Sequence, residues 1–286
     1  MVDFFTVYRS LECRPDSYMD WYQQGNLLKQ REDYPAALNS YEKALEYYPD
    51  DYWAWYKRGI ILEQLGRYEE AVNSYEQAAM IDENNYWAWY DRGCIYLHEL
   101  RDYSEAIKCF AKALEANPDD YWAAYRQGEA WRLAAQYEKA IATYDRALKS
   151  RPQDYWCWYR RGDAFKAWGK TEEALNNYRQ ALKAKPDDYW CWYQQALIHQ
   201  QLQDSREAIQ CYDRVLRIDR RDGASWYNWA CCHIILGHKS EAIEGLTKAL
   251  KLNPETYLAS VRSYYLFNDL RALPEFVELI AKYKNY

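Results

Sequence analysis

Side chains able to support catalysis or to bind a metal are few in this chain. The run Cys231-Cys232-His233 holds three metal-ligating groups, but adjacent residues on a helix point about 100° apart and cannot close one tetrahedral site by themselves. No glycine-rich phosphate loop, His-Glu-x-x-His motif or nucleophile elbow occurs. The sequence therefore predicts that the protein is not an enzyme and needs no cofactor and no metal. The histidines are scattered, at His98, His199, His233 and His238.

Aromatic rings are the chemical feature that recurs. The stretch Asp51-Tyr52-Trp53-Ala54-Trp55-Tyr56 returns with small changes after Asn85, Asp120, Asp154 and Asp188. The glycines that follow these stretches keep a step of 34 residues, from Gly25 to Gly59 to Gly93 and again from Gly128 to Gly162. This is the period of a helix-turn-helix repeat, so the rings must be positioned by a stacked array of helix pairs.

The local signals agree with two helices in each repeat. In the repeat that begins at Tyr52, Asp51 is the expected N-cap, the first helix is expected over about 52–65 and the second over about 68–81. Gly66 and Arg67 form the turn between them. The second helix carries Ala71 and, four residues later, Tyr75, which places a small residue and a ring on one face.

These residues resemble a known family. The pattern Trp-x-x-x-Gly, then Ala-x-x-x-Tyr-x-x-Ala, then Pro is similar to the tetratricopeptide repeat (TPR), and the Trp-Tyr-x-Arg-Gly variant is similar to multi-repeat TPR proteins of photosynthetic bacteria. The resemblance implies an all-α, right-handed superhelical TPR solenoid of about seven helix-turn-helix repeats with helical caps.

The repeat boundaries follow from the leading tyrosines. We expect an N-terminal capping helix in residues 1–17, and a degenerate repeat with a capping helix in residues 257–286, where a helix over 257–267 is joined through Asn268 and Asp269 to a closing helix over 274–283. The seven repeats between these caps are expected at 18–51, 52–85, 86–120, 121–154, 155–188, 189–222 and 223–256.

In the TPR family the first helix of each repeat lines a concave groove, with its second and fifth positions facing that groove. Carried over to this chain, those positions hold tryptophan and tyrosine. The resemblance implies a partner-binding ladder of Trp53, Tyr56, Trp87, Tyr90, Trp122, Tyr125, Trp156, Tyr159, Trp190 and Tyr193.

Two roles are open for the tryptophan at the second position. It could plug against the end of the preceding helix, or it could bind a partner; tryptophan at the fourth position, such as Trp55, is instead expected in the core. Each aromatic side chain can bury about 150 to 250 Å², so five half-exposed tryptophans would approach or exceed the roughly 300 to 600 Å² patch that monomers usually carry. Polar residues deeper in the groove are expected to set the register of a partner: Glu63, Glu129, Arg132, Asp163 and Lys166.

Charge narrows the kind of partner. The chain has 37 basic and 43 acidic residues, a net charge of −6, and no basic stripe of the kind that a phosphate backbone requires. Nucleic acid is therefore disfavoured. A clamp for the C-terminal carboxylates of chaperones is excluded as well, because Tyr22, Trp87 and Asp91 stand where that clamp needs basic residues.

The sequence thus favours a non-catalytic protein-protein interaction scaffold that binds a peptide or helix of another protein, in the assembly or localisation of that protein. A single-stranded RNA-binding protein that stacks bases on the aromatic ladder is the alternative from another class, and self-association through the ladder is a third reading. The absence of a secretion signal and of a long apolar run predicts a cytoplasmic protein without a membrane span, with its cysteines reduced.

Overall fold

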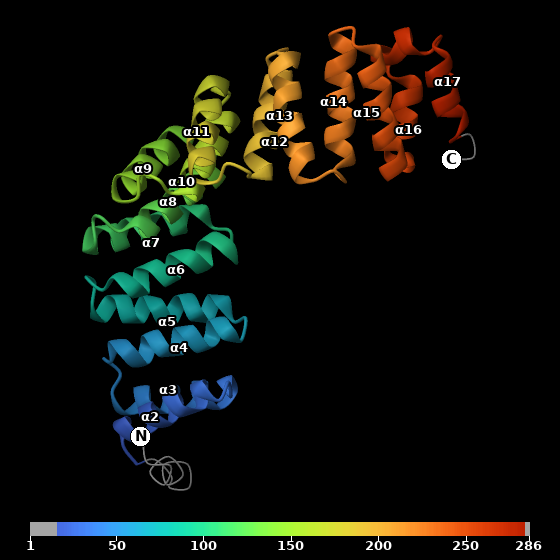
Figure 1. Cartoon of the computed structure of the whole chain (residues 1–286). Coiled ribbons are helices and arrows are strands. Elements are labelled where there is room, and N and C mark those ends of the chain that lie inside the picture. Colours follow the sequence, from blue (N-terminus) through green and yellow to red (C-terminus); the bar gives the residue numbers. More distant parts are fainter. Residues whose placement is uncertain (1–15, 284–286) are drawn as a thin grey trace. The chain divides into compact units, whose positions relative to one another are not determined.

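The computed structural model describes residues 16–283, and in this range every regular element is a helix (Figure 1). The expected N-terminal capping helix lies outside the described residues except for Asp16 and Ser17. The chain divides into two compact parts, an N-terminal part that ends at Arg151 and a C-terminal part that starts at Pro152. We describe each part by itself.

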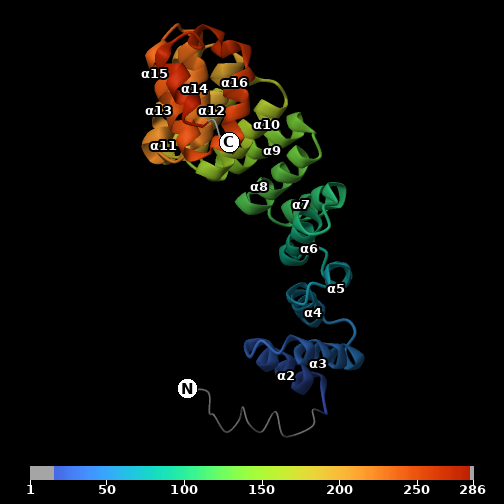
Figure 2. The same ribbon diagram turned by 90° about the vertical axis from the view of Figure 1, so that its right-hand side faces the viewer.

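From Tyr18 to Leu252 the helices come in consecutive pairs of 13 and 14 residues. The N-terminal part contains α2 (Tyr18–Gln30), α3 (Tyr34–Tyr47), α4 (Tyr52–Gln64), α5 (Tyr68–Ile81), α6 (Tyr86–His98), α7 (Tyr103–Ala116), α8 (Tyr121–Leu133) and α9 (Tyr137–Ser150). The C-terminal part contains α10 (Tyr155–Ala167), α11 (Thr171–Ala184), α12 (Tyr189–Gln201), α13 (Ser205–Ile218), α14 (Gly223–Ile235), α15 (Lys239–Leu252), α16 (Pro254–Ser263), the 3-10 helix η1 (Tyr265–Leu270) and α17 (Pro274–Ala281). The two helices of a pair, such as α4 and α5, lie side by side in both views of the chain (Figures 1 and 2).

Capping and turn residues set the ends of these helices as the sequence predicts. The Asp51 carboxylate accepts a hydrogen bond from the Ala54 backbone N–H at 2.5 Å, and Asp188 does the same for Cys191 at 2.8 Å. Gly66 ends the first helix of its repeat with a φ of 71°, a conformation that favours glycine. Helices α4 and α5 therefore begin at the expected residues.

A close approach of ring to backbone holds the two helices of a pair together. A Cβ atom added to Gly59 on α4 would lie 2.7 Å from Cε1 of Tyr75 on α5. The Tyr75 ring is completely buried, as is Ala71 one turn before it. The glycine of the repeat is thus required because the ring occupies the space that any side chain would need.

Hydrogen bonds between tyrosine and the next N-cap join one repeat to the following one. The Tyr52 hydroxyl donates to Oδ1 of Asn85 at 2.7 Å, and the Tyr86 hydroxyl donates to Oδ1 of Asp120 at 2.8 Å. Asn85 also accepts from the Trp87 backbone N–H and so caps α6. One side chain therefore both starts a helix and fixes the repeat that precedes it.

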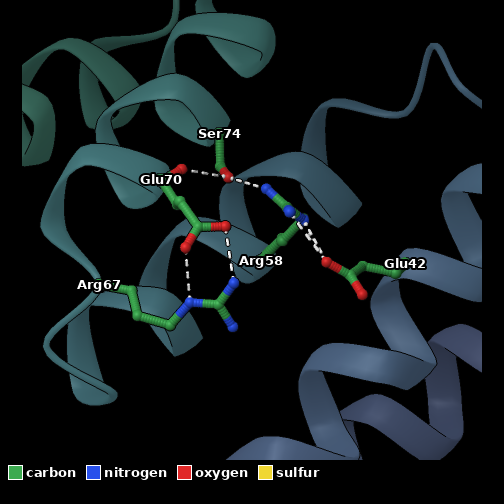
Figure 3. A network of polar contacts seen from close by, with 5 residues as sticks. All are labelled: Glu42, Arg58, Arg67, Glu70 and Ser74. Atoms are coloured by element: carbon green, nitrogen blue, oxygen red, sulfur yellow. Dashed lines mark hydrogen bonds and ion pairs between the residues drawn. The ribbon is translucent and has the colours of Figure 1, made fainter.

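Arginine at the seventh position links three helices, as Figure 3 shows for Arg58 on α4. Its guanidinium donates to Glu42 on α3 at 2.8 Å and to the Ser74 hydroxyl on α5 at 2.6 Å, and it lies 5.6 Å from the centre of the Trp55 ring. By contrast, Arg67 pairs with Glu70, three residues away on the surface (Figure 3). The Arg58 guanidinium thus lies over the Trp55 ring while it pairs with a carboxylate.

The C-terminal helices differ from the predicted bounds. Helix α16 begins at Pro254 because Asn253 accepts a hydrogen bond from the Thr256 N–H and proline at the first helical position needs no acceptor. The helix ends at Ser263, and the expected link at Asn268 and Asp269 lies inside η1. Phe267 and Leu270 of η1 are buried in one cluster with residues of α14 and α15, which accounts for an ordered turn where a link was expected.

Candidate functional site

The second-position tryptophans lie at the surface. Each side chain is between 46% and 57% exposed, whereas the residue that follows each of them, such as Ala54 or Cys157, is fully buried. The first helix of the repeat therefore turns one face into the core and leaves the indole at its edge. Trp53, Trp87 and Trp122 belong to the N-terminal part, and Trp156 and Trp190 belong to the C-terminal part.

Each of these tryptophans makes an edge-on contact with the tyrosine before it, so that the two rings stand nearly at right angles. The Tyr52 and Trp53 ring centres are 5.1 Å apart with an interplanar angle of 89°, and the Tyr121 and Trp122 centres are 5.0 Å apart at 77°. We call such a pair of a first-position tyrosine and a second-position tryptophan an aromatic corner. Edge contact of this kind orders the indole, which stays about half-exposed.

The fifth-position tyrosines are placed differently. Tyr56, Tyr125 and Tyr159 are buried, and Tyr90 and Tyr193 are half-buried. The Tyr56 ring stacks on Tyr52 with ring centres 5.8 Å apart, and its hydroxyl donates to Asp91 at 2.5 Å. The fifth-position tyrosines thus expose little surface. The second-position tryptophans are therefore the candidate binding residues.

The fourth-position tryptophans are half-buried rather than fully in the core. The Trp55 indole N–H donates to the Pro49 carbonyl at 2.7 Å, and the Trp158 indole N–H donates to the Pro152 carbonyl at 2.8 Å. A polar indole N–H needs an acceptor when it leaves water, and the preceding loop supplies one. Trp55 and Trp158 therefore pack as expected, and each also anchors the preceding loop through a hydrogen bond.

The polar residues expected to set the register of a partner are largely engaged within the protein. Glu63 accepts from the Tyr75 hydroxyl at 3.2 Å, and Asp163 accepts from the Tyr178 hydroxyl at 2.9 Å. Glu129 is buried in an ion pair with Arg126 at 2.9 Å, and Lys166 donates to Gln194 at 2.5 Å. The expectation overlooked the buried tyrosines, whose hydroxyls need acceptors.

A cavity of about 610 Å³ lies between two neighbouring corners of the N-terminal part. Its polar groups come from Asn117, Asp120 and Arg126. Its aromatic lining is Tyr86, Trp87, Tyr90 and Trp122. Trp87 and Trp122 thus flank a hollow of a size that holds a bulky side chain.

Comparisons with known proteins fit this architecture. Sequence models described as tetratricopeptide repeat or TPR repeat match residues 22–85, 90–155, 162–203, 191–222 and 223–256. The chain belongs to the tetratricopeptide repeat family. The predicted all-helical TPR fold is thereby confirmed. A comparison with curated proteins found no match.

Solved structures of TPR proteins share the fold at low sequence identity. The C-terminal part of a TPR repeat-containing protein from Cytophaga hutchinsonii is 16% identical, with a TM-score of 0.69 over 82% of this chain and 96% of that one. A TPR protein from Parabacteroides merdae is 17% identical, with a TM-score of 0.59 over 92% and 97%. YrrB, described as a TPR protein with an unusual peptide-binding site, is 18% identical, with a TM-score of 0.56 over 66% and 96%.

Two aromatic corners of this TPR protein are covered by a cation, which sequence reasoning missed. The Arg151 guanidinium lies 4.2 Å from the centre of the Tyr121 ring and 5.3 Å from that of Trp122. The Lys185 ammonium lies 4.1 Å from the centre of the Tyr155 ring and 5.1 Å from that of Trp156. The signal was present in the sequence as a basic residue 30 positions after the tyrosine in each of these repeats.

The thiols and imidazoles of the TPR array are packing groups. Burial raises the pKa of the Cys94 and Cys231 thiols to about 12, which keeps them protonated at neutral pH. Burial likewise lowers the pKa of His233, whose Nδ1 lies 3.3 Å from Nδ1 of His238. Within residues 16–283 no three His, Cys, Asp or Glu side chains gather as a metal site would require. In the same range no helix combines the length and apolar character needed to cross a bilayer.

Proposed function

We propose that this TPR protein is a non-catalytic scaffold that binds a peptide or helix of another protein on its second-position tryptophans, and so assembles or localises that protein. The observation that carries the proposal is the half-exposure of all five tryptophans beside fully buried neighbours. Three half-exposed indoles in the N-terminal part present on the order of 300 Å² of aromatic surface, comparable to the largest patch on an ordinary monomer.

The electrostatics of the corners favour a peptide over RNA. Stacked bases bring phosphates, and each phosphate needs a nearby cation. The corner at Tyr52 has Asp82 beside it, and the cavity between Trp87 and Trp122 contains Asp120, while the Arg126 of that cavity is already paired with Glu129. Carboxylates at these places repel a phosphate backbone, whereas an apolar or basic peptide meets no such cost.

The proposal is tested with peptides selected from a random 15-residue phage library on the immobilised full-length chain. Their affinities are then measured for Trp87→Ala, Trp122→Ala and Trp190→Ala. If these indoles are hot spots, at least one variant should lose about 2 kcal/mol of binding, or roughly 30-fold in Kd. Its free energy of unfolding should fall by only about 1 kcal/mol or less, because the side chain is half-exposed.

Two control variants separate binding from folding. Trp168→Ala removes an exposed tryptophan outside the corners, which Lys170 covers at 3.9 Å, and should leave binding unchanged. Trp158→Ala removes a packed indole with its hydrogen bond and should cost stability first. The proposal fails if the selected peptides bind all second-position variants as tightly as the wild type, or if their binding follows stability alone. Tight binding of single-stranded RNA with a steep salt dependence would favour the RNA alternative.

A further inference from the structure

The residue that ends the second helix of each repeat occupies one fixed place, and we call it the corner residue. The backbone angles of this residue are nearly constant, with φ of −136° and ψ of 89° at Asp82, and φ of −135° and ψ of 80° at Arg151. Its side chain therefore leaves the backbone in the same direction in every repeat. In the first six repeats the corner residues are Tyr48, Asp82, Asn117, Arg151, Lys185 and Asp219.

That direction leads to the first-position tyrosine of the same repeat. The Tyr48 ring makes an edge contact with the Tyr18 ring, with centres 5.8 Å apart. Arg151 and Lys185 lie over their corners, close enough to both rings for a cation–π interaction, whose range is about 6 Å. The chain thus shows twice how a cation fills an aromatic corner.

Asp82 puts an anion where Arg151 and Lys185 put a cation. The corner of Tyr52 and Trp53 has the same ring geometry as the filled ones, and the described part of the chain places no lysine or arginine over either ring. One Asp82 oxygen accepts from the Asn85 amide at 3.3 Å. Burial raises the pKa of the Tyr52 hydroxyl, and the Asp82 charge adds to the rise.

We propose that Tyr52, Trp53 and Asp82 form a site for an arginine or lysine side chain of the partner. Such a side chain would take the place over the rings that Arg151 takes over Tyr121, and it would pair with the Asp82 carboxylate at the same time. The inference rests on the proposed function, to which it adds the chemistry of the partner: a segment with basic side chains. Asp219 gives the corner of Tyr189 and Trp190 the same composition in the C-terminal part.

The test uses hexa-arginine as the probe and hexa-citrulline as its neutral counterpart of the same shape. Asp82→Arg fills the corner from within, as Arg151 does, and Arg151→Asp opens a filled corner. Both changes copy a residue that the chain already has at an equivalent position, so both variants should fold, which circular dichroism checks. Glu69→Arg on the exposed side of α5 makes the same change in net charge as Asp82→Arg, away from the corner.

Titration calorimetry on the full-length chain at 150 mM salt should show that Asp82→Arg weakens hexa-arginine binding at least about fivefold more than Glu69→Arg does. Arg151→Asp should tighten binding about fivefold, and hexa-citrulline should bind poorly to every variant. The inference is overturned if hexa-arginine does not bind, if citrulline binds equally well, or if Asp82→Arg and Glu69→Arg have the same effect. It is likewise overturned if Arg151→Asp fails to tighten binding.

Failure of this inference is distinguishable from failure of the proposed function. If the phage-selected peptides lack basic residues and still depend on the second-position tryptophans, the scaffold proposal stands and the cation site falls. If they do not depend on the tryptophans, the scaffold proposal falls by its own test.

Discussion

At the scale of single residues, buried hydroxyls and thiols are the unusual feature of this chain. The Tyr41 and Tyr75 rings are completely buried, and burial raises the pKa of their hydroxyls. Burial raises the pKa of Tyr90 and Tyr159 to about 12, as it does for the Cys94 thiol. The Tyr41 and Tyr75 hydroxyls bond to the other helix of their own repeat, and burial disfavours the ionised form of all these groups, so their ionisation is coupled to folding.

This coupling predicts a loss of stability in alkali. The folded chain holds these protons more tightly than the unfolded chain, whose thiols and phenols titrate near 9 and 10. Their contribution to stability is therefore complete below about pH 9 and is lost as the pH rises toward 12. The melting temperature should be level from pH 7 to about 9 and should fall above that range. Tyrosinate absorbance at 295 nm should rise together with the loss of helical circular dichroism, and a level melting temperature up to pH 11 would contradict the coupling.

At the scale of helices, the contacts of Arg58 stabilise the fold more than the surface ion pair of Arg67 and Glu70 does (Figure 3). The Arg58 side chain is 17% exposed, joins α3, α4 and α5, and stacks on Trp55. The Arg67 side chain is 45% exposed and pairs with one carboxylate on its own helix. The first contact links three elements, whereas the second links two residues that the helix already holds together.

Alanine at these two arginines should separate the two roles. Arg58→Ala leaves the Ser74 and Glu42 partners behind and should cost about 1 to 2 kcal/mol of unfolding free energy. Arg67→Ala should cost less than about 0.5 kcal/mol. Urea denaturation followed by circular dichroism measures both, and equal losses would show that the bridge between helices adds nothing.

The period of glycine, alanine and tyrosine was sufficient to predict the helices of the middle repeats, and α4 ends one residue before the expected 52–65. The same period did not predict that, on one helix, the Trp53 ring is half-exposed and the Tyr56 ring is buried. The resemblance to the family predicted that Trp53 and Tyr56 both face the groove, yet Tyr56 is buried and bonded to Asp91 of the next repeat, while Trp53 is half-exposed. Such contacts come from another repeat, and no periodicity within a helix reports them.

The contacts of the corner residues could not be predicted from helical periodicity either. Arg151 contacts Trp122, which lies 29 residues earlier and at the opposite end of the repeat. Helical spacing links residues three and four apart, so a contact that closes a whole repeat leaves no trace in that pattern. Only a comparison of equivalent positions in successive repeats would have singled out Arg151, Lys185 and Asp82.

At the scale of the whole molecule, local contacts dominate. Each helix packs mainly on its neighbours in sequence, so the stability of a repeat array is close to a sum of repeat and interface terms. A change in one repeat should therefore be felt nearby and fade along the chain.

Gly59→Ala is a test of that locality. Its new methyl group would lie 2.7 Å from the Tyr75 ring, so overpacking should outweigh the roughly 1 kcal/mol that alanine gains in a helix. Hydrogen exchange should accelerate in α4, α5 and the adjoining α3 and α6, while α14 and α15 keep their protection. Ala196→Gly, the reverse change at the equivalent position, should instead loosen α12 and α13. Uniform acceleration along the chain for either variant would contradict a local response.

The joint between repeats has a consequence for how the gene can change. At the joints described above, the first-position tyrosine is the donor and the N-cap of the next repeat is the acceptor, as with Tyr52 and Asn85 or Tyr189 and Asp222. Duplication or loss of one complete repeat would bring a tyrosine of one copy to the cap of another and leave the same bond. Recombination between the similar coding stretches can thus add or remove a repeat while the hydrogen bond at each joint is kept.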